Sequence, residues 1–249
     1  MSNLKEQITN HRSIRKYKKE PIPDNMLRQI LEAGISASNT GNMQVYSMVV
    51  TKDEDLRKQL WETHFRQNMV LQAPVHITFC ADVNRFSKWC RARQAEPAYE
   101  NLLWFCNAAV DATLASQNVA LAAESFGLGI CYLGTAIYNA GRIIDILKLP
   151  KGVIPITALV MGYPDEQPSL TGRLPLDAVV HNEIYREFTN EEIDDLYADL
   201  ESTEQTRQLL EFNKKETLAH VFTENRYTRK DNEAVSETYM EVMKKQVFL

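Results

Sequence analysis

One long alanine-rich segment, residues 107–126, constrains the fold of this chain more than any other stretch. Small and apolar residues fall on nearly every side of the helix that it would form, and Gly127 follows it directly. Glycine is the residue that most often stands just past the end of a helix. Because a helix that is apolar all round is usually buried, we expect a long central helix with its neighbours packed closely against it.

The remaining pattern mixes strands with helices. Strand patterns cover residues 46–51, 75–81, 130–133 and 154–162. Helices are expected before Asn10, from an N-cap at Asp24 to about residue 37, and over 53–64, 139–149, 190 to about 212, and 231–245. The absence of strict strand–helix alternation favours an α+β or mixed α/β layered architecture. The part beyond residue 164 has too few apolar residues for a good core of its own and should cover another surface.

Composition excludes several classes of protein. The 249 residues carry a net charge of −5, whereas a general nucleic-acid binder would be basic. No apolar run approaches the roughly 20 residues that span a membrane, and the N-terminus lacks the apolar core of a signal peptide. The four cysteines form no C-x-x-C pair, so a reduced, cytoplasmic protein without membrane or nucleic-acid partners is expected.

The densest group of candidate functional residues is the stretch HRSIR, residues 11–15. In an extended conformation His11, Ser13 and Arg15 would share one side, with Arg12 between them. Guanidinium and hydroxyl donors suit the oxygens of a phosphate group. The alternative is a solvated basic loop, which the lysines that follow would extend. Composition alone favours that alternative over a binding site.

Two further segments could take part in a site. Arg173, in LTGRLP, becomes relevant only if the fold brings it near Arg15. In GLGICYLGT, residues 127–135, Gly129 and Gly134 would let the backbone approach a flat ligand closely, although a helix cap and a tight turn explain the same glycines. The five histidines are too scattered to suggest a metal site, and no phosphate-binding P-loop or G-x-S-x-G elbow is present.

These segments together resemble the nitroreductase and flavin-reductase superfamily, and most closely its NADPH-preferring, oxygen-insensitive branch. The resemblance rests on four ordered blocks: HRSIR, ASQNVALAAESFGLGICYLG (115–134), LKLPKGVIPITALVMGYP (147–164), and GRLP followed by VVHNEIY (179–185). It covers residues 8–185 and reverses the preference for a solvated loop at 11–15. It implies the nitroreductase fold, a central, mostly antiparallel sheet flanked by helices, in an intertwined homodimer with FMN at the interface.

The resemblance also implies which residues would bind FMN. The matching positions are His11, Arg12, Ser13, Arg15, Asn39, Gln44, Gln67, Tyr132, Leu133, Gly134 and Arg173. His11, Ser13 and Arg173 would hold the phosphate or the ribityl chain. Relatives often carry a lysine where this chain has Thr171, so one phosphate cation is missing here.

The other matching positions would surround the flavin ring. Arg15 would lie near the N1–C2 edge and tune the reactivity of the flavin, which makes it the one residue assigned a catalytic role. Asn39 and Gln44 match a loop that meets the ring from the other subunit. Gln67 would bind the pyrimidine edge, and the turn 132–134 would bring a backbone N–H towards N5.

The implied function is an FMN-dependent oxidoreductase with NADPH or NADH as co-substrate. By a ping-pong hydride transfer it would reduce a small acceptor such as a nitroaromatic, a quinone or free flavin. The alternatives are a specialised flavin-dependent reductase of the dehalogenase kind and a non-enzymatic flavin-binding or storage protein. The division expected is an FMN-binding domain, 1–185, and an extension, 186–249, packed on that domain or on the partner subunit. The extension holds a basic cluster, Arg226, Arg229 and Lys230, that could meet the 2′-phosphate of NADPH.

Overall fold

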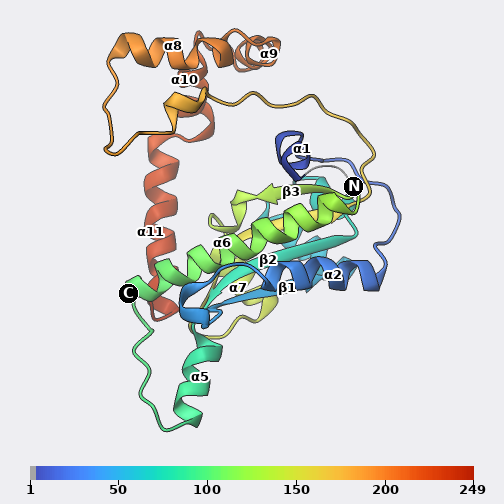
Figure 1. The fold of residues 1–249 in the computed structure, drawn as a ribbon, viewed down its shortest axis with the longest axis vertical. Helices are drawn as coiled ribbons and strands as arrows, with labels where there is room; N and C mark the ends of the chain where they lie inside the picture. Colours follow the sequence, from blue (N-terminus) through green and yellow to red (C-terminus); the bar gives the residue numbers. More distant parts are fainter. Residues whose placement is uncertain (1–3) are drawn as a thin grey trace. The chain divides into compact units, whose positions relative to one another are not determined.

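The computed structural model describes residues 4–249 and contains a four-stranded sheet with helices on both faces (Figure 1). The strand order is β1-β2-β4-β3, and every neighbouring pair is antiparallel. The strands are β1 (Tyr46–Thr51), β2 (Val75–Asp82), β3 (Gly129–Leu133) and β4 (Val153–Gly162). The expected α+β architecture with a mostly antiparallel sheet is therefore confirmed, and all four expected strands are present.

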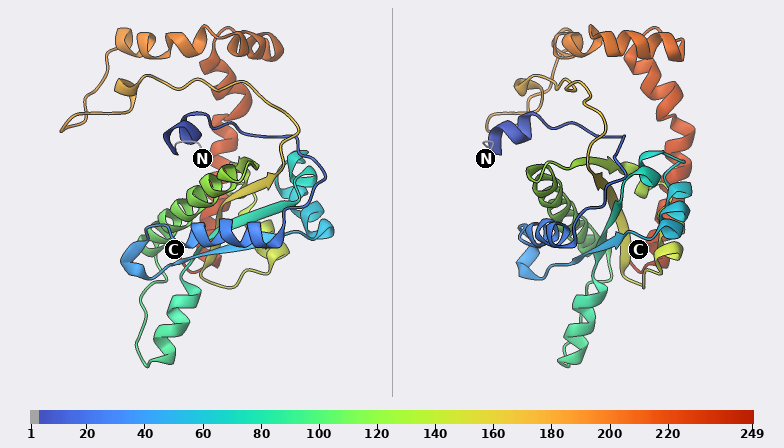
Figure 2. Two further views of the ribbon diagram at one scale, coloured as in Figure 1. Left: turned by 45° about the vertical axis from the view of Figure 1, so that its right-hand side comes forward. Right: turned by 90° about the vertical axis from the view of Figure 1, so that its right-hand side faces the viewer.

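Helices cover both faces of this sheet, as the two views of Figure 2 show. On one face lie α2 (Asp24–Ile35) and α6 (Leu102–Ser125), which pack against each other and against the strands. On the other face lie α3 (Glu54–Thr63), α4 (Met69–Gln72) and α7 (Ala140–Leu147). The remaining elements that precede residue 137 are α1 (Leu4–Thr9), η1 (Thr40–Asn42), α5 (Asn84–Ala92) and η2 (Gly134–Ala136).

The two sides of the sheet are filled by alternate residues of the strands. On β4, Leu159 and Met161 join the core under α2 and α6, whereas Ala158 and Val160 join the core under α3 and α7. The continuous apolar run of β4 follows from this, because a central strand covered on both faces has no side left for polar residues.

The long helix differs from its expected form in two ways. It begins at Leu102 rather than near 107, because the side chain of Asn101 caps it by accepting a hydrogen bond from the Trp104 backbone N–H at 3.1 Å. The expectation that the helix is buried on every side is wrong for the isolated chain, since Leu103 and Val110 are 67% and 56% exposed. The C-terminal end is as expected, with Gly127 at φ 78°.

Two other helix boundaries need correction. Asp24 is the first residue of α2 rather than its N-cap, and its carboxylate pairs with Lys52 at 2.5 Å instead of capping the helix. The helix expected over 190–212 is two helices, α8 (Asn190–Glu201) and α9 (Glu204–Asn213). The break lies at Thr203, whose hydroxyl accepts a hydrogen bond from the Thr206 backbone N–H at 3.1 Å and starts a new helix.

The chain divides into two compact units. The first contains the described residues up to Ser169 together with Glu237–Leu249, and the second is Leu170–Ser236. The second unit holds η3 (Leu176–Ala178), α8, α9, α10 (Leu218–His220) and the π-helical turn η4 (Val221–Arg226), and α11 (Arg229–Lys245) crosses the boundary. No helix in the described part of the chain is long and apolar enough to cross a membrane.

Candidate functional site

The basic motif at residues 11–15 lies beside β3, although more than a hundred residues separate them in the sequence. Ser13 and Ile130 form a parallel bridge, and the backbone N–H of Ile14 donates to the carbonyl of Ile130 at 2.8 Å. Two segments that the sequence singled out independently, the basic motif and the glycine-containing turn, are therefore neighbours in space.

Gly129 makes this close approach possible. A Cβ atom on Gly129 would lie 2.6 Å from Cγ1 and 2.7 Å from Cβ of Ile14. Such distances are shorter than packed side chains tolerate, so any larger residue would push the motif away from β3. Ile14 itself is buried in the core that also contains Tyr17 and Leu133.

The motif is held from its other side by the segment after β4. Tyr17 forms an antiparallel bridge with Pro164, and its hydroxyl donates to the Ile14 carbonyl at 2.5 Å. The carboxylate of Glu166 accepts hydrogen bonds from the backbone N–H groups of Arg15 and Lys16, at 2.5 and 3.1 Å. Burial raises the pKa of the Tyr17 hydroxyl well above its usual value, so this donor keeps its proton. The backbone of the motif is thus fixed on both sides.

A cavity of about 590 Å³ opens beside the start of the motif. The predicted residues His11 and Arg12 line it, with Ile14 and Gly129 below them. The other lining residues come from three regions, namely Glu6, Gln7 and Asn10 near the N-terminus, Glu124 and Leu128 at the end of α6, and Pro164, Glu166 and Gln167 after β4. Ser13 and Arg15 do not line this cavity.

The charged groups of this cavity are only partly neutralised. His11 Nδ1 lies 2.5 Å from a carboxylate oxygen of Glu124. One guanidinium nitrogen of Arg12 donates to the Asn10 carbonyl at 3.0 Å, while its Nε is buried and has no partner in the described part of the chain. A buried donor without a partner is costly, and an anionic ligand would relieve that cost. The carboxylates of Glu6, Glu124 and Glu166, however, disfavour an anion beside them.

The turn that follows β3 presents backbone rather than side chains to open space. Leu133 is buried, and the Tyr132 hydroxyl donates to Ser116 Oγ on α6 at 3.1 Å. Burial raises the pKa of that hydroxyl. Gly134 is exposed, and a Cβ atom built on it would meet nothing within 4 Å. A flat ligand could therefore approach the backbone here, which is the fit that a flavin ring requires.

Gln67 belongs to a segment that is tied to this turn. Its backbone N–H donates to the His64 carbonyl at 3.2 Å. The His64 ring in turn contacts Thr135, the residue after Gly134, with 2.7 Å between Nδ1 and Oγ1. The side-chain amide of Asn139 donates to the Thr63 carbonyl at 2.7 Å and forms a second link. Gln67 is expected to meet the pyrimidine edge of the flavin, and the turn 132–134 is expected to meet N5. The hydrogen bonds of His64 thus link these two segments.

Asn39 and Gln44 lie together in the loop before β1. The Gln44 backbone N–H donates to Asn39 Oδ1 at 3.1 Å. Asp111 on α6 holds the same loop, because one of its oxygens accepts from both the backbone N–H and the hydroxyl of Thr40, at 2.9 and 3.0 Å. Asp111 is 1% exposed, so these bonds form away from water and fix the loop firmly. Gln44 remains exposed and can reach a neighbouring molecule.

Arg173 and the basic cluster belong to the second compact unit. The Arg173 guanidinium donates to the carbonyls of Thr171 and Gly172 in its own loop, at 3.0 and 3.1 Å. In the cluster, Arg226 lies over the Phe222 ring, and Arg229 is 3.8 Å from Glu233. The expected meeting of Arg173 with Arg15 stays a prediction, as does the role of the cluster.

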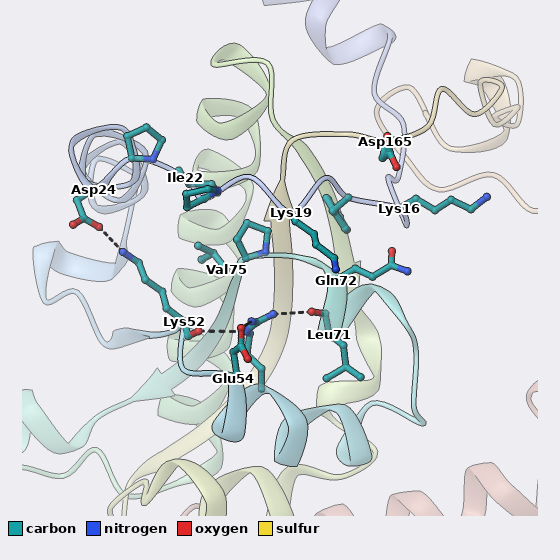
Figure 3. Close-up of a pocket in the computed structure, with 15 residues that line it drawn as sticks. Lys16, Lys19, Ile22, Asp24, Lys52, Glu54, Leu71, Gln72, Val75 and Asp165 are labelled. Carbon is teal, nitrogen blue, oxygen red and sulfur yellow. Dashed lines mark hydrogen bonds and ion pairs between the residues drawn. The ribbon is translucent and has the colours of Figure 1, made fainter.

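A larger cavity, of about 1020 Å³, lies where the chain continues beyond the motif (Figure 3). Its cationic side chains are Lys16, Lys19, Lys52 and Arg57. Two of them are already engaged. Lys52 reaches Asp24 (Figure 3), and Arg57 donates to the carbonyls of Leu71 and Ala73 at 2.9 and 2.6 Å. None of the residues that the sequence assigned to FMN lines this cavity, so it does not correspond to the expected site.

Several residues that shape the site were absent from the sequence-based prediction. Glu124 and Glu166 contact the motif only through the fold, and no local pattern marks them. His64 and His76 were dismissed among scattered histidines, yet their rings meet, with 3.2 Å between the two Nε2 atoms. Asp111 did carry a signal, because it is the only charged residue in the alanine-rich segment between 107 and 123.

Comparison with known proteins bears on the same segments. The model of the nitroreductase family matches residues 8–163. A solved protein from Bacteroides fragilis NCTC 9343 is 47% identical, with a TM-score of 0.97 over 98% of this chain and 99% of its own. The FMN reductase (NAD(P)H) of Bacillus subtilis strain 168 is 36% identical over 196 residues, covering 74% of this chain and 75% of the reductase. The oxygen-insensitive NADPH nitroreductase of Salmonella typhimurium is 37% identical over 186 residues, covering 75% of this chain and 76% of the nitroreductase.

Proposed function

Because this chain belongs to the nitroreductase family, we propose that it is an FMN-dependent oxidoreductase that passes hydride from NADPH or NADH to a small acceptor. Relatives named FMN reductase and oxygen-insensitive NADPH nitroreductase support this activity, with nitroaromatics, quinones and free flavin as the acceptor class. The observation that carries the proposal is the contact between the basic motif and β3, made by Ile14 and Ile130. This contact brings the basic motif next to the strand that leads into the open turn at Gly134, which supports the proposal.

The residues present suit FMN in two respects. Arg12 has a buried Nε without a partner in the described part of the chain, and this donor suits a phosphate oxygen. At Gly134 the backbone faces open space that a planar ring could occupy. We assign His11, Arg12 and Ser13 to the phosphate and ribityl chain, and Gln67 and the turn 132–134 to the ring. Arg173 is assigned to the phosphate on the resemblance to the family alone.

FMN bound at this site would supply the redox chemistry, accepting two electrons as hydride and passing them to the acceptor. The protein then has to bind and orient the cofactor and stabilise its charge. Arg15 is exposed at the end of the motif, while its backbone N–H is held by Glu166 at 2.5 Å. A fixed guanidinium favours negative charge at the ring edge that it faces. No general base is required for such a transfer, which agrees with the lack of an acid–base pair in the sequence.

We propose that two copies of the chain form the working unit, an intertwined homodimer. The exposed side of α6 supports this, because Leu103, Val110 and Leu114 follow one another at helical spacing on its surface. An apolar surface of this kind usually marks a protein–protein interface. The exposed Gln44, in a loop anchored by Asp111, would then reach the flavin of the partner.

We also propose a division of the chain into two parts and a set of contacts with NADPH. We place the FMN-binding domain at residues 1–185 and the extension at 186–249, which packs on the domain or on the partner. The extension exposes large apolar residues, including Phe212 and Tyr227 at 86 and 51%. Such residues suit a segment that covers another surface. The cluster of Arg226, Arg229 and Lys230 offers the charge that a 2′-phosphate needs.

We also propose that the protein works in the cytoplasm. All four cysteines, Cys80, Cys90, Cys106 and Cys131, are free. Three of them are buried, and burial raises the pKa of Cys80 to about 12. Such thiols stay protonated and unreactive, as suits a protein kept in a reducing compartment.

The proposal is tested on purified protein loaded with FMN and kept free of oxygen. Addition of NADPH or NADH should bleach the visible flavin absorption, and nitrofurazone or excess FMN should restore it. A protein that binds FMN but is bleached by neither nicotinamide would instead be a flavin-storage protein. Failure to bind FMN at all would contradict the proposal entirely.

A further inference from the structure

Two buried histidines connect the sheet to the turn at Gly134. His76 lies on β2, His64 directly follows α3 as its C-cap, and both are 0% exposed. Their Nε2 atoms are 3.2 Å apart, and His64 Nδ1 is 2.7 Å from the hydroxyl oxygen of Thr135. His76, His64 and Thr135 therefore form a chain of hydrogen bonds from the interior of the sheet to the 3₁₀ turn that contains Gly134.

Only one proton can lie between the two Nε2 atoms, so each ring is held in a single tautomer. If His64 donated that proton, His76 would carry its own on Nδ1, which is buried and meets only the backbone of His76 itself, without the geometry of a full hydrogen bond. If His76 donates, its Nδ1 is left as an unpaired acceptor. A buried ring nitrogen in that state costs less than a buried N–H without an acceptor. The second arrangement is therefore favoured, and it puts a proton on His64 Nδ1.

The position of the proton on His64 decides whether the Thr135 hydroxyl accepts or donates in its hydrogen bond with this ring. With a proton on Nδ1, His64 donates to Thr135 Oγ1, so the hydroxyl hydrogen of Thr135 does not point back to His64. No other partner of this hydroxyl is present among the described residues. Thr135 is only partly buried and directly follows the open Gly134. Its hydroxyl hydrogen is thus available to donate at the edge of the space that the flavin would occupy.

We propose that Thr135 donates a hydrogen bond to the flavin ring and that His64 and His76 are positioning residues that orient this hydroxyl. The inference rests on the proposed function, because the acceptor is the ring of FMN. The link from Asn139 to Thr63 braces the same turn from the opposite end and limits its movement.

Both histidines are held neutral, which the chain of hydrogen bonds requires. Burial lowers the pKa of His64 to about 4 and that of His76 to about 3. The neighbouring His64 and then the Arg57 guanidinium also disfavour a positive charge on His76 and lower its pKa further. The tautomers therefore persist across the neutral pH range, and the donor at Thr135 does not depend on the protonation state of the pair.

The role of Thr135 is tested by comparing Thr135→Val, which removes the hydroxyl at nearly constant shape, with Thr135→Ser, which keeps it. FMN should bind about tenfold more weakly to the valine variant, as expected for one lost hydrogen bond. The serine variant should stay within about twofold of the unchanged protein. The position of the visible flavin band in bound FMN should also shift in the valine variant and stay in place in the serine variant, which weaker occupancy alone would not cause. Equal affinity and an identical spectrum in the valine variant would overturn the inference.

The role of the histidines has a test that needs no flavin. In protein labelled with ¹⁵N-histidine, the nitrogen spectrum should show the proton of His64 on Nδ1 and that of His76 on Nε2. The opposite assignment would overturn the directional chain. His64→Asn, which can still donate near the Nδ1 position, should keep FMN affinity, whereas His64→Gln should lose it as Thr135→Val does. Equal affinity of the two variants would contradict the positioning role.

These outcomes separate the inference from the proposed function. If the unchanged protein binds FMN and Thr135→Val binds it equally well, the role of Thr135 is wrong while the flavoenzyme assignment stands. If the unchanged protein binds no FMN, the flavoenzyme assignment itself is wrong, and the role of Thr135 fails with it.

Discussion

The backbone N–H of Ile14 donates to the carbonyl of Ile130 at 2.8 Å, and this bond joins the basic motif to β3. It is accompanied by the parallel bridge between Ser13 and Ile130. Because the bond uses only main-chain atoms, it constrains the path of the motif more than the identity of its side chains. The residue that controls the approach is Gly129, which has no Cβ atom to separate the two segments.

Gly129→Ala should therefore destabilise the protein and disturb the motif together. The new Cβ would lie 2.6 Å from Ile14, and overpacking of this kind costs about 1–3 kcal/mol. Urea unfolding should show that loss in the free energy of unfolding, and FMN affinity should fall with it. Unchanged stability would mean that the motif moves away freely.

Gly134→Ala provides the matched control. A Cβ on Gly134 meets nothing within 4 Å, so the free energy of unfolding should change by less than about 0.5 kcal/mol. FMN affinity should nevertheless drop, because the methyl group would stand where the ring approaches the backbone. If FMN binds Gly134→Ala normally, the ring does not lie against this turn.

Much of the fold was predictable because its signals are local. Periodicity located all four strands, and Gly127 marked the end of α6 correctly. The errors also have local causes. The sequence offers Asp24 as a good N-cap, yet a nearby lysine draws its carboxylate away. Thr203 lies inside a helical pattern, and its capping role is easy to overlook beside many charged residues.

The site was less predictable, since its geometry depends on distant segments. Residue chemistry raised a phosphate-binding hypothesis at 11–15, and only the resemblance to a family turned it into an FMN site. The contact between His64 and His76 arises because α3 packs against the face of the sheet that β2 presents, which no spacing reveals. The apolar outer side of α6 was expected to be buried, and in one chain it is not.

Glu124 should weaken the binding of phosphate at His11. The carboxylate lies 2.5 Å from His11 Nδ1, and its charge opposes a phosphate placed at the same ring. Glu124→Gln keeps a hydrogen-bonding group but removes the charge, which should raise FMN affinity by about fivefold, or about 1 kcal/mol. Riboflavin, which lacks the phosphate, should bind both proteins equally. An equal gain for riboflavin would show that the effect does not concern the phosphate.

The histidine pair should make the protein less stable in acid. Both folded-state pKa values, about 4 and about 3, lie below the ordinary value of 6.5, so the unfolded chain binds more protons between these limits. Stability is therefore complete above pH 6.5 and falls as the pH drops below it, by about 2 kcal/mol for each histidine between pH 7 and pH 5. Urea unfolding at both pH values measures the loss. His76→Gln should show a smaller pH dependence, and an unchanged dependence would mean that His76 is not held neutral.

Arg15→Ala tests the charge placed near the flavin. The Arg15 side chain is exposed, and its guanidinium donates to the nearby Ser13 carbonyl at 3.5 Å, so stability should be nearly unchanged. FMN affinity or the rate of flavin reduction should fall by about tenfold, the scale of one lost charge-assisted interaction. Lys18→Ala, in the same basic stretch, is the control and should alter neither quantity. Normal behaviour of Arg15→Ala in both measurements would refute its assigned role.

The most direct test of the central claim is rapid mixing of the FMN-loaded protein with NADPH or NADH in the absence of oxygen. We expect the visible flavin absorption to be lost in a single turnover and to return when nitrofurazone is added afterwards without further nicotinamide. The two half-reactions would then be separate, as a ping-pong cycle requires. Flavin that stays oxidised with both nicotinamides would contradict the account.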